Sequence, residues 1–138
     1  MTNPNERLDP ATHMDTLSLR VFDLATMVEF YTAGVGLVLL GEGGGTLTLG
    51  LGDHPVLKLV HAPELRRPPS SAAGLYHSAV LFDSQADLSA SLLSIFTSHP
   101  HTYTGSADHL VSEAFYFTDP ERNGLELSAD RHREGCPW

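Results

Sequence analysis

The sequence is poor in cysteine, in basic residues and in long apolar runs, and each shortage excludes a class of protein. The single cysteine, Cys136, excludes an internal disulfide framework and is typical of a reducing, cytoplasmic setting. Only 8 Lys and Arg stand against 17 Asp and Glu, a formal net charge of −9. A nucleic-acid partner is therefore not expected, because phosphate binding needs a basic surface. No apolar run approaches the ~18 residues of a membrane span, and the polar N-terminus predicts no signal segment.

What the sequence does contain fits a single globular domain. Its 138 residues, 41% of them hydrophobic, are enough for one domain with a core and too few for two ordinary ones. Eight histidines are many for this length, which favours a metal site, although most of them should be ordinary surface residues.

Alternating apolar and polar residues predict eight strands, and apolar residues at helical spacing predict two helices. Asp23 and Ser84 are the predicted N-caps of these helices, and glycines at 34 and 36 end the first one. The predicted strands cover 16–22, 37–40, 46–51, 55–61, 76–82, 101–104, 114–118 and 125–129.

These elements form the same βαβββ order twice, with a Pro- and Ser-rich linker between the copies. We expect an α+β fold in which two curved sheets enclose a cleft, because one module cannot cover its own sheet. The predicted divisions are a flexible arm (1–13) and a single domain (14–138) made of module one (14–61), linker (62–73), module two (74–131) and tail (132–138).

Two residues of ligand type stand within apolar strands of the second module. Glu126 lies between Leu125 and Leu127, and an ionised carboxylate buried there must be paired, protonated or bound to a metal. His77 stands at the head of another apolar strand. We predict that His77 and Glu126 belong to one metal-type site.

The chain resembles the vicinal-oxygen-chelate superfamily, which includes glyoxalases, bleomycin-resistance proteins and extradiol dioxygenases. The most specific stretch begins at Asp108-His109, continues through Tyr116 and Asp119-Pro120, and ends at Asn123-Gly124 and Glu126, with Ala107 and Arg122 departing from the dioxygenase signature. Further support comes from the segments 19–24, 29–31, 36–37 and 74–77. Within the superfamily the chain is most similar to the N-terminal half of catechol 2,3-dioxygenase-type proteins.

This resemblance implies two βαβββ modules that form a curved mixed sheet around a divalent metal, Fe(II) or Mn(II), unless the site has lost its metal. His77 and Glu126 match metal-ligand positions, and His109 and Tyr116 match residues that supply protons and hydrogen bonds to the substrate. In module one, however, Thr16 and Lys58 occupy the two remaining ligand positions. A third ligand could come from His13, from His61 through a bulge, or from a second copy in a homodimer.

Structural alternatives accompany each assignment. His77 and Glu126 could form a buried hydrogen-bonded pair, while His109 and Tyr116 could be a surface histidine and a core tyrosine. Lys58 could neutralise Glu126 or extend into solvent, and the proline in 99–101 favours a solvated loop there. Two functions follow: a ring-cleaving dioxygenase acting on a catechol-type small molecule, or a non-catalytic small-molecule binder of the resistance type.

Overall fold

The computed structural model of the chain describes residues 9, 12–66, 69 and 74–131. The predicted tail lies outside the described residues, as do parts of the predicted arm and linker. Module one contains β1 (Leu17–Val21), α1 (Leu24–Glu29), η1 (Phe30–Gly34), β2 (Val38–Gly43), β3 (Thr46–Leu51) and β4 (His54–His61). Module two contains β5 (His77–Phe82), α2 (Gln85–Ser98), β6 (Tyr103–Asp108), β7 (Ser112–Thr118) and β8 (Gly124–Asp130).

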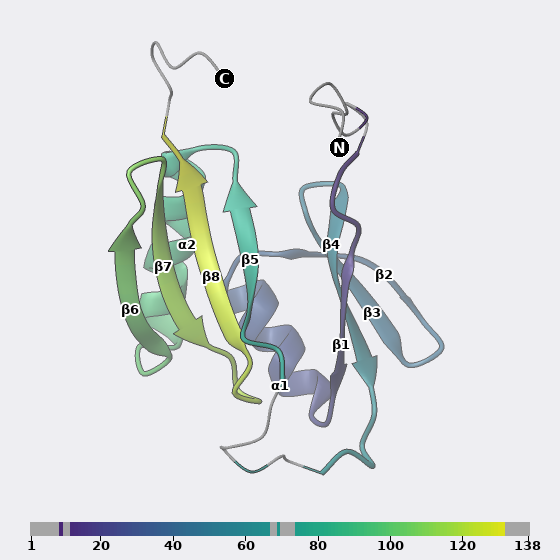
Figure 1. Cartoon of the computed structure of the whole chain (residues 1–138). Coiled ribbons are helices and arrows are strands. Elements are labelled where there is room, and N and C mark those ends of the chain that lie inside the picture. The colour runs from purple at the N-terminus through teal and green to yellow at the C-terminus, as the bar shows by residue number, and fades with distance from the viewer. Residues whose placement is uncertain (1–8, 10–11, 67–68, 70–73, 132–138) are drawn as a thin grey trace, which may run out of the picture.

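Each module builds a four-stranded mixed sheet, in the order β1-β4-β3-β2 and β5-β8-β7-β6. The first and last strands of each module pair in parallel, and the other neighbours are antiparallel. The predicted α+β fold of two βαβββ modules is thus confirmed. The expected curved sheet is in fact two separate sheets. Their edge strands β1 and β5 face one another without pairing (Figure 1).

The predicted helix starts are confirmed, because each is fixed by a local hydrogen bond. The Asp23 side chain accepts from the Thr26 N–H at 3.1 Å, and the Ser84 hydroxyl accepts from the Asp87 N–H at 3.1 Å. After α1 the backbone widens into the π-helix η1, in which the Val35 N–H donates to the Phe30 carbonyl. Among the described residues, no helix is long and apolar enough to cross a membrane.

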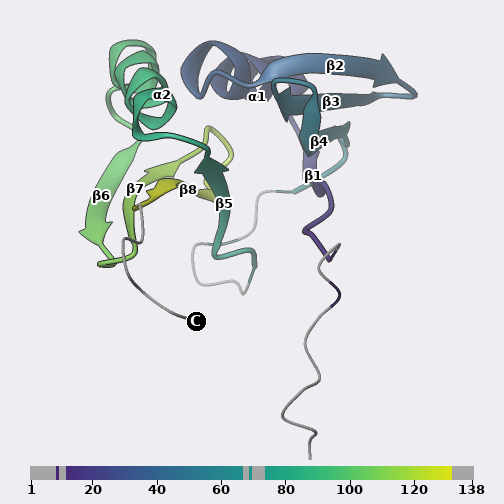
Figure 2. The same ribbon diagram turned by 90° about the horizontal axis from the view of Figure 1, so that it is seen from above.

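The helices of both modules lie together on one side of the molecule (Figure 2). Helix α2 packs on η1 of the other module, where the hydroxyls of Ser91 and Ser94 donate to the carbonyls of Val35 and Ala33. One hydrophobic core lies between these helices and the two sheets, and both modules contribute to it. None of the described helices lies on the opposite, concave faces of the sheets, where the polar side chains of interest lie (Figure 2).

Two predictions from the sequence need correction. The strand predicted at 101–104 occupies Tyr103–Asp108, because β6 is an edge strand with little apolar alternation to mark it. His99 is not part of a solvated loop: it ends α2, is half-buried, and packs edge-on against Phe30 with ring centroids 5.2 Å apart.

Candidate active site

The structure brings His77 and Glu126 together on the concave face of the second sheet. His77 Nε2 lies 3.1 Å from Glu126 Oε2, and the two side chains are 30% and 15% exposed. Strand pairing sets this distance, because β5 and β8 are parallel neighbours and Glu126 lies opposite Ala79, two residues from His77. Leu125 and Leu127 point to the other side of the sheet, into the core.

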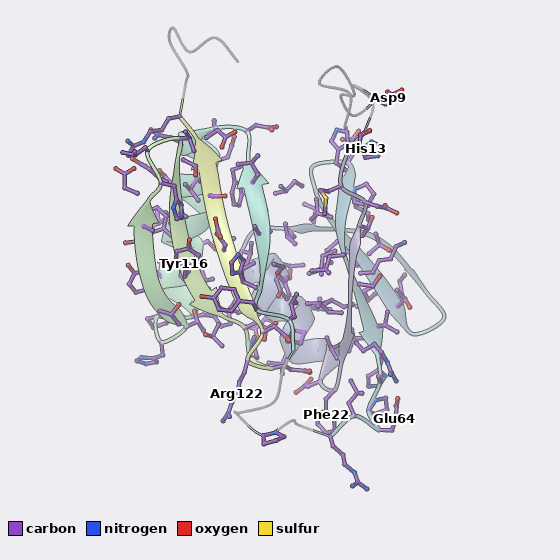
Figure 3. The ribbon with its side chains drawn as sticks, in the orientation of Figure 1. Asp9, His13, Phe22, Glu64, Tyr116 and Arg122 are labelled. Carbon is purple, nitrogen blue, oxygen red and sulfur yellow. The ribbon has the colours of Figure 1, made fainter. Side chains whose placement is uncertain are left out.

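Tyr116 and His109 extend this pair into a continuous polar chain. Tyr116 is the cross-strand neighbour of Glu126 and lies on the side of the sheet away from α2 (Figure 3). Its hydroxyl lies 2.9 Å from Nε2 of His109, which sits in the turn between β6 and β7. Burial, followed by the negative charge of Glu126, raises the pKa of the Tyr116 hydroxyl. We call the four residues His109, Tyr116, Glu126 and His77 the polar chain.

We expect the ionisation of Tyr116 to depend on Glu126. In a spectrophotometric titration, the phenol that disappears in Tyr116→Phe should ionise above the ordinary pKa of 10.0. In Glu126→Gln its pKa should fall, because the nearby negative charge is removed, but burial should keep it above the ordinary value. An identical Tyr116 titration in wild type and Glu126→Gln would contradict the contact between the two side chains.

Module one presents different chemistry at the equivalent positions. Thr16 lies seven residues before the N-cap Asp23, as His77 lies seven before the N-cap Ser84. Lys58 pairs with Ser18, two residues after Thr16, just as Glu126 pairs with Ala79, two residues after His77. The concave face of module one therefore carries a hydroxyl and an exposed ammonium group where module two carries an imidazole and a carboxylate.

Lys58 does not neutralise Glu126. The two side chains form no ion pair in the described part of the chain. Lys58 instead acts on Asp15, whose pKa is lowered mainly by hydrogen bonds from Thr16 and to a smaller extent by the positive charge of Lys58. Of the two alternatives for Lys58, the structure therefore favours an exposed side chain.

The proposed bulge that would turn His61 inward is absent. The pairing of β1 with β4 runs unbroken from Leu17↔Leu57 to Val21↔His61, so His61 lies on the face opposite Lys58. His61 instead borders an apolar surface beside α1. His13 precedes β1 at an exposed position and acts on Asp15.

The donor pair fits part of a metal site. Two adjacent ligands of an octahedral ion, each ~2.1 Å from it, lie about 3.0 Å apart, close to the 3.1 Å between His77 and Glu126. Within the described residues, no group of three His, Cys, Asp or Glu side chains is placed to hold an ion. His77 and Glu126 could therefore hold two corners of a site whose third ligand comes from elsewhere.

Comparison with known proteins assigns the family. The profile of the Glyoxalase/Bleomycin resistance protein/Dioxygenase superfamily matches residues 13–127. The chain belongs to this superfamily. The resemblance inferred from the sequence is confirmed, and the matched region includes all four residues of the polar chain.

The relatives of this superfamily member agree with that assignment. Catechol-2,3-dioxygenase of Bacillus subtilis (strain 168) is 31% identical over 124 residues, which cover 88% of this chain and 43% of that protein. The chain thus spans less than half the length of this relative. A glyoxalase/dioxygenase from Nostoc punctiforme matches with a TM-score of 0.71 at 20% identity, over 93% of this chain and 99% of the other. Lactoylglutathione lyase from Agrobacterium tumefaciens matches with a TM-score of 0.63 at 20% identity, over 88% and 96%.

Sequence reasoning missed a buried network behind the polar chain. Asp119 is 3% exposed, and its carboxylate accepts hydrogen bonds from the N–H groups of Glu121 and Asn123 and from the Tyr31 hydroxyl, the last at 3.1 Å. Tyr31 belongs to η1 of module one, so this bond joins the two modules. The Asp-Pro pair at 119–120 marked a turn in the sequence, but no signal paired it with a tyrosine 88 residues away.

The network holds the start of β8 against His77. The turn that Asp119 organises leads directly into Gly124, which pairs with His77 in the sheet. A Cβ atom at Gly124 would collide with the Tyr76 carbonyl oxygen and lie 2.9 Å from the His77 Cβ atom. Only glycine allows this close approach, which fixes the distance between the strands that carry His77 and Glu126.

Proposed function

We propose that the protein binds a small molecule with neighbouring oxygen atoms, of the catechol type, on its concave face and acts on it as a dioxygenase-like enzyme. The observation that carries this proposal is the polar chain, in which two histidines, a tyrosine and a carboxylate lie next to one another across 3 strands and a turn. Superfamily membership and the likeness to a catechol-2,3-dioxygenase support it.

The residues of the chain would handle protons in such a reaction. The Tyr116 hydroxyl, whose pKa is raised above the ordinary 10.0, can donate a hydrogen bond to a ligand oxygen. His109 contacts that hydroxyl, and an imidazole in this position can serve as a general acid or base. A substrate hydroxyl placed beside Tyr116 would thus have an acid/base group one hydrogen bond away.

A divalent metal, Fe(II) or Mn(II), would be held by His77 and Glu126. Such an ion supplies Lewis-acid activation to a substrate that binds it through two oxygen atoms. Two protein ligands hold an ion weakly, and the two-histidine, one-carboxylate set used by non-haem iron oxygenases requires one more histidine. We propose that a second copy of the chain supplies the missing ligand in a homodimer. The exposed apolar residues of the edge strand β2, Val38, Leu39 and Leu40, offer a surface for such an association.

The test is elemental analysis of the protein after anaerobic loading with Fe(II) or Mn(II). We expect bound metal in the wild type and a loss of about tenfold or more in affinity in His77→Ala, because a ligand is removed. The variant His101→Ala, which removes an exposed histidine away from the site, should bind metal as the wild type does. Wild-type protein that binds no metal under these conditions would contradict the dioxygenase mechanism for this chain.

The second candidate function is a non-catalytic binder that holds the same class of molecule without a metal. Lys58 and Thr16 favour it, because an ammonium group repels a dication and a threonine hydroxyl is a weak ligand. In this case the hydrogen bonds of the polar chain would hold the ligand oxygens directly.

A further inference from the structure

An apolar cavity lies along the seam between the two sheets. Its volume is about 230 Å³, and both modules line it. Module one contributes the leucines at 17, 37, 51 and 57 together with Val56, and module two contributes Ala79, Val80 and Leu81. The cavity exists because β1 and β5 face each other without strand pairing, so side chains rather than hydrogen bonds define the space between them.

The cavity opens toward the concave face. Ala79 is exposed and Leu81 is 53% exposed, so apolar surface at the mouth is left in contact with water. An occupant that covers these side chains gains hydrophobic stabilisation in proportion to the apolar area removed from water. Ala79 is also the strand neighbour of Glu126, which places the mouth beside the polar chain.

Two hydroxyl groups lie in the otherwise apolar wall. Tyr31 and Ser78 both line the cavity. The Tyr31 hydroxyl already donates to Asp119 at 3.1 Å, so its oxygen can accept a further bond. The wall thus offers apolar contact and a hydrogen-bond acceptor together.

We propose that this cavity binds a single aromatic ring that carries a hydroxyl group. The volume supports one ring, since an apolar cavity of ~150 Å³ holds benzene and the present one has room for a substituent. This inference rests on the proposed function in one respect. The reactive end of a ligand bound in the cavity would extend from the seam to the polar chain. The site itself needs no metal.

The experiment measures binding of 4-fluorophenol to metal-free protein by ¹⁹F NMR. Ala79→Leu should weaken binding by about tenfold or more, because the larger side chain fills the mouth of the cavity. Ala86→Leu, which adds the same volume at an exposed site on α2, should leave the affinity unchanged. Glu126→Gln, whose side chain lies outside the cavity, tests whether the ring binds on the polar chain instead.

The outcomes separate this inference from the proposed function. If Glu126→Gln weakens binding and Ala79→Leu does not, the ring lies on the polar chain, and the cavity proposal is wrong while the proposed function survives. Absence of 4-fluorophenol binding to the wild type overturns the cavity proposal. A change from dimer to monomer in Ala79→Leu, measured by light scattering, also overturns it, because the seam is then an interface between copies.

Discussion

Replacing Asp119 with alanine is expected to lower the free energy of unfolding by about 3 kcal/mol or more, because breaking a buried hydrogen-bond network is one of the few changes that exceed the usual effect of a substitution. The carboxylate accepts from the N–H groups of Glu121 and Asn123 at 2.9 and 2.8 Å, and from the Asn123 amide at 2.9 Å. Its loss would also leave the hydroxyl of Tyr31, which is 1% exposed, without this acceptor. Urea denaturation followed by circular dichroism measures the change.

Asp108→Ala is the matched control. Asp108 also accepts from a backbone N–H in a turn of module two and from the Arg131 side chain, but it is exposed. Water replaces its lost partners, so we expect a much smaller loss of stability than in Asp119→Ala. Equal denaturation midpoints for Asp119→Ala and the wild type would show that the buried network does not stabilise the fold.

The network also predicts an unusual pH dependence. Burial raises the pKa of Asp119 above its ordinary value of 3.8, despite the hydrogen bonds that lower it. A carboxyl group whose pKa is raised by folding contributes stability below its unfolded pKa and loses it as the pH rises through the folded pKa. The stability advantage of wild type over Asp119→Asn should therefore shrink as the pH rises above the ordinary value of 3.8 and through the raised pKa of the folded state.

Local signals in the sequence predicted the fold well. The N-caps Asp23 and Ser84 and the strand Thr46–Leu51 were predicted correctly, because capping bonds and alternation involve residues close in the chain. Both modules could be recognised because each repeats the same short pattern. The edge strand β6 was misplaced because it has exposed residues and no alternation that distinguishes it from a loop.

The candidate site was only partly predictable, because its contacts depend on register. The pairing of His109 with Tyr116 needs a reversal of the chain in which Leu110 adopts a positive φ of 68° and the strand pairing shifts between Tyr103 and Gly105. Leucine gives no local signal for that backbone conformation. The Tyr31–Asp119 bond joins residues 88 positions apart, a distance at which one sequence carries no pairing information.

A second prediction uses the equivalence of the two modules to build the missing ligands. The double variant Thr16→His with Lys58→Glu should bind Mn(II) more tightly than the wild type by ~100-fold or more, since losing even an outer partner of a metal ligand costs ~10–100-fold. The first change adds an imidazole at the position equivalent to His77. The second replaces a repelling ammonium group, the chain's single lysine, with a carboxylate at the position equivalent to Glu126.

The control keeps the new carboxylate in place and moves the new histidine two residues along the chain, into β1. Ser18→His with Lys58→Glu puts the histidine on the same concave face, but ~7 Å further along, two residues from the equivalent of His77. Titration of each variant with Mn(II), followed by electron paramagnetic resonance, gives the affinities. If the Thr16→His variant gains no more affinity than the Ser18→His variant, the two modules do not converge on one metal site within a chain. The third ligand must then come from a second copy, or the concave face binds its ligand without a metal.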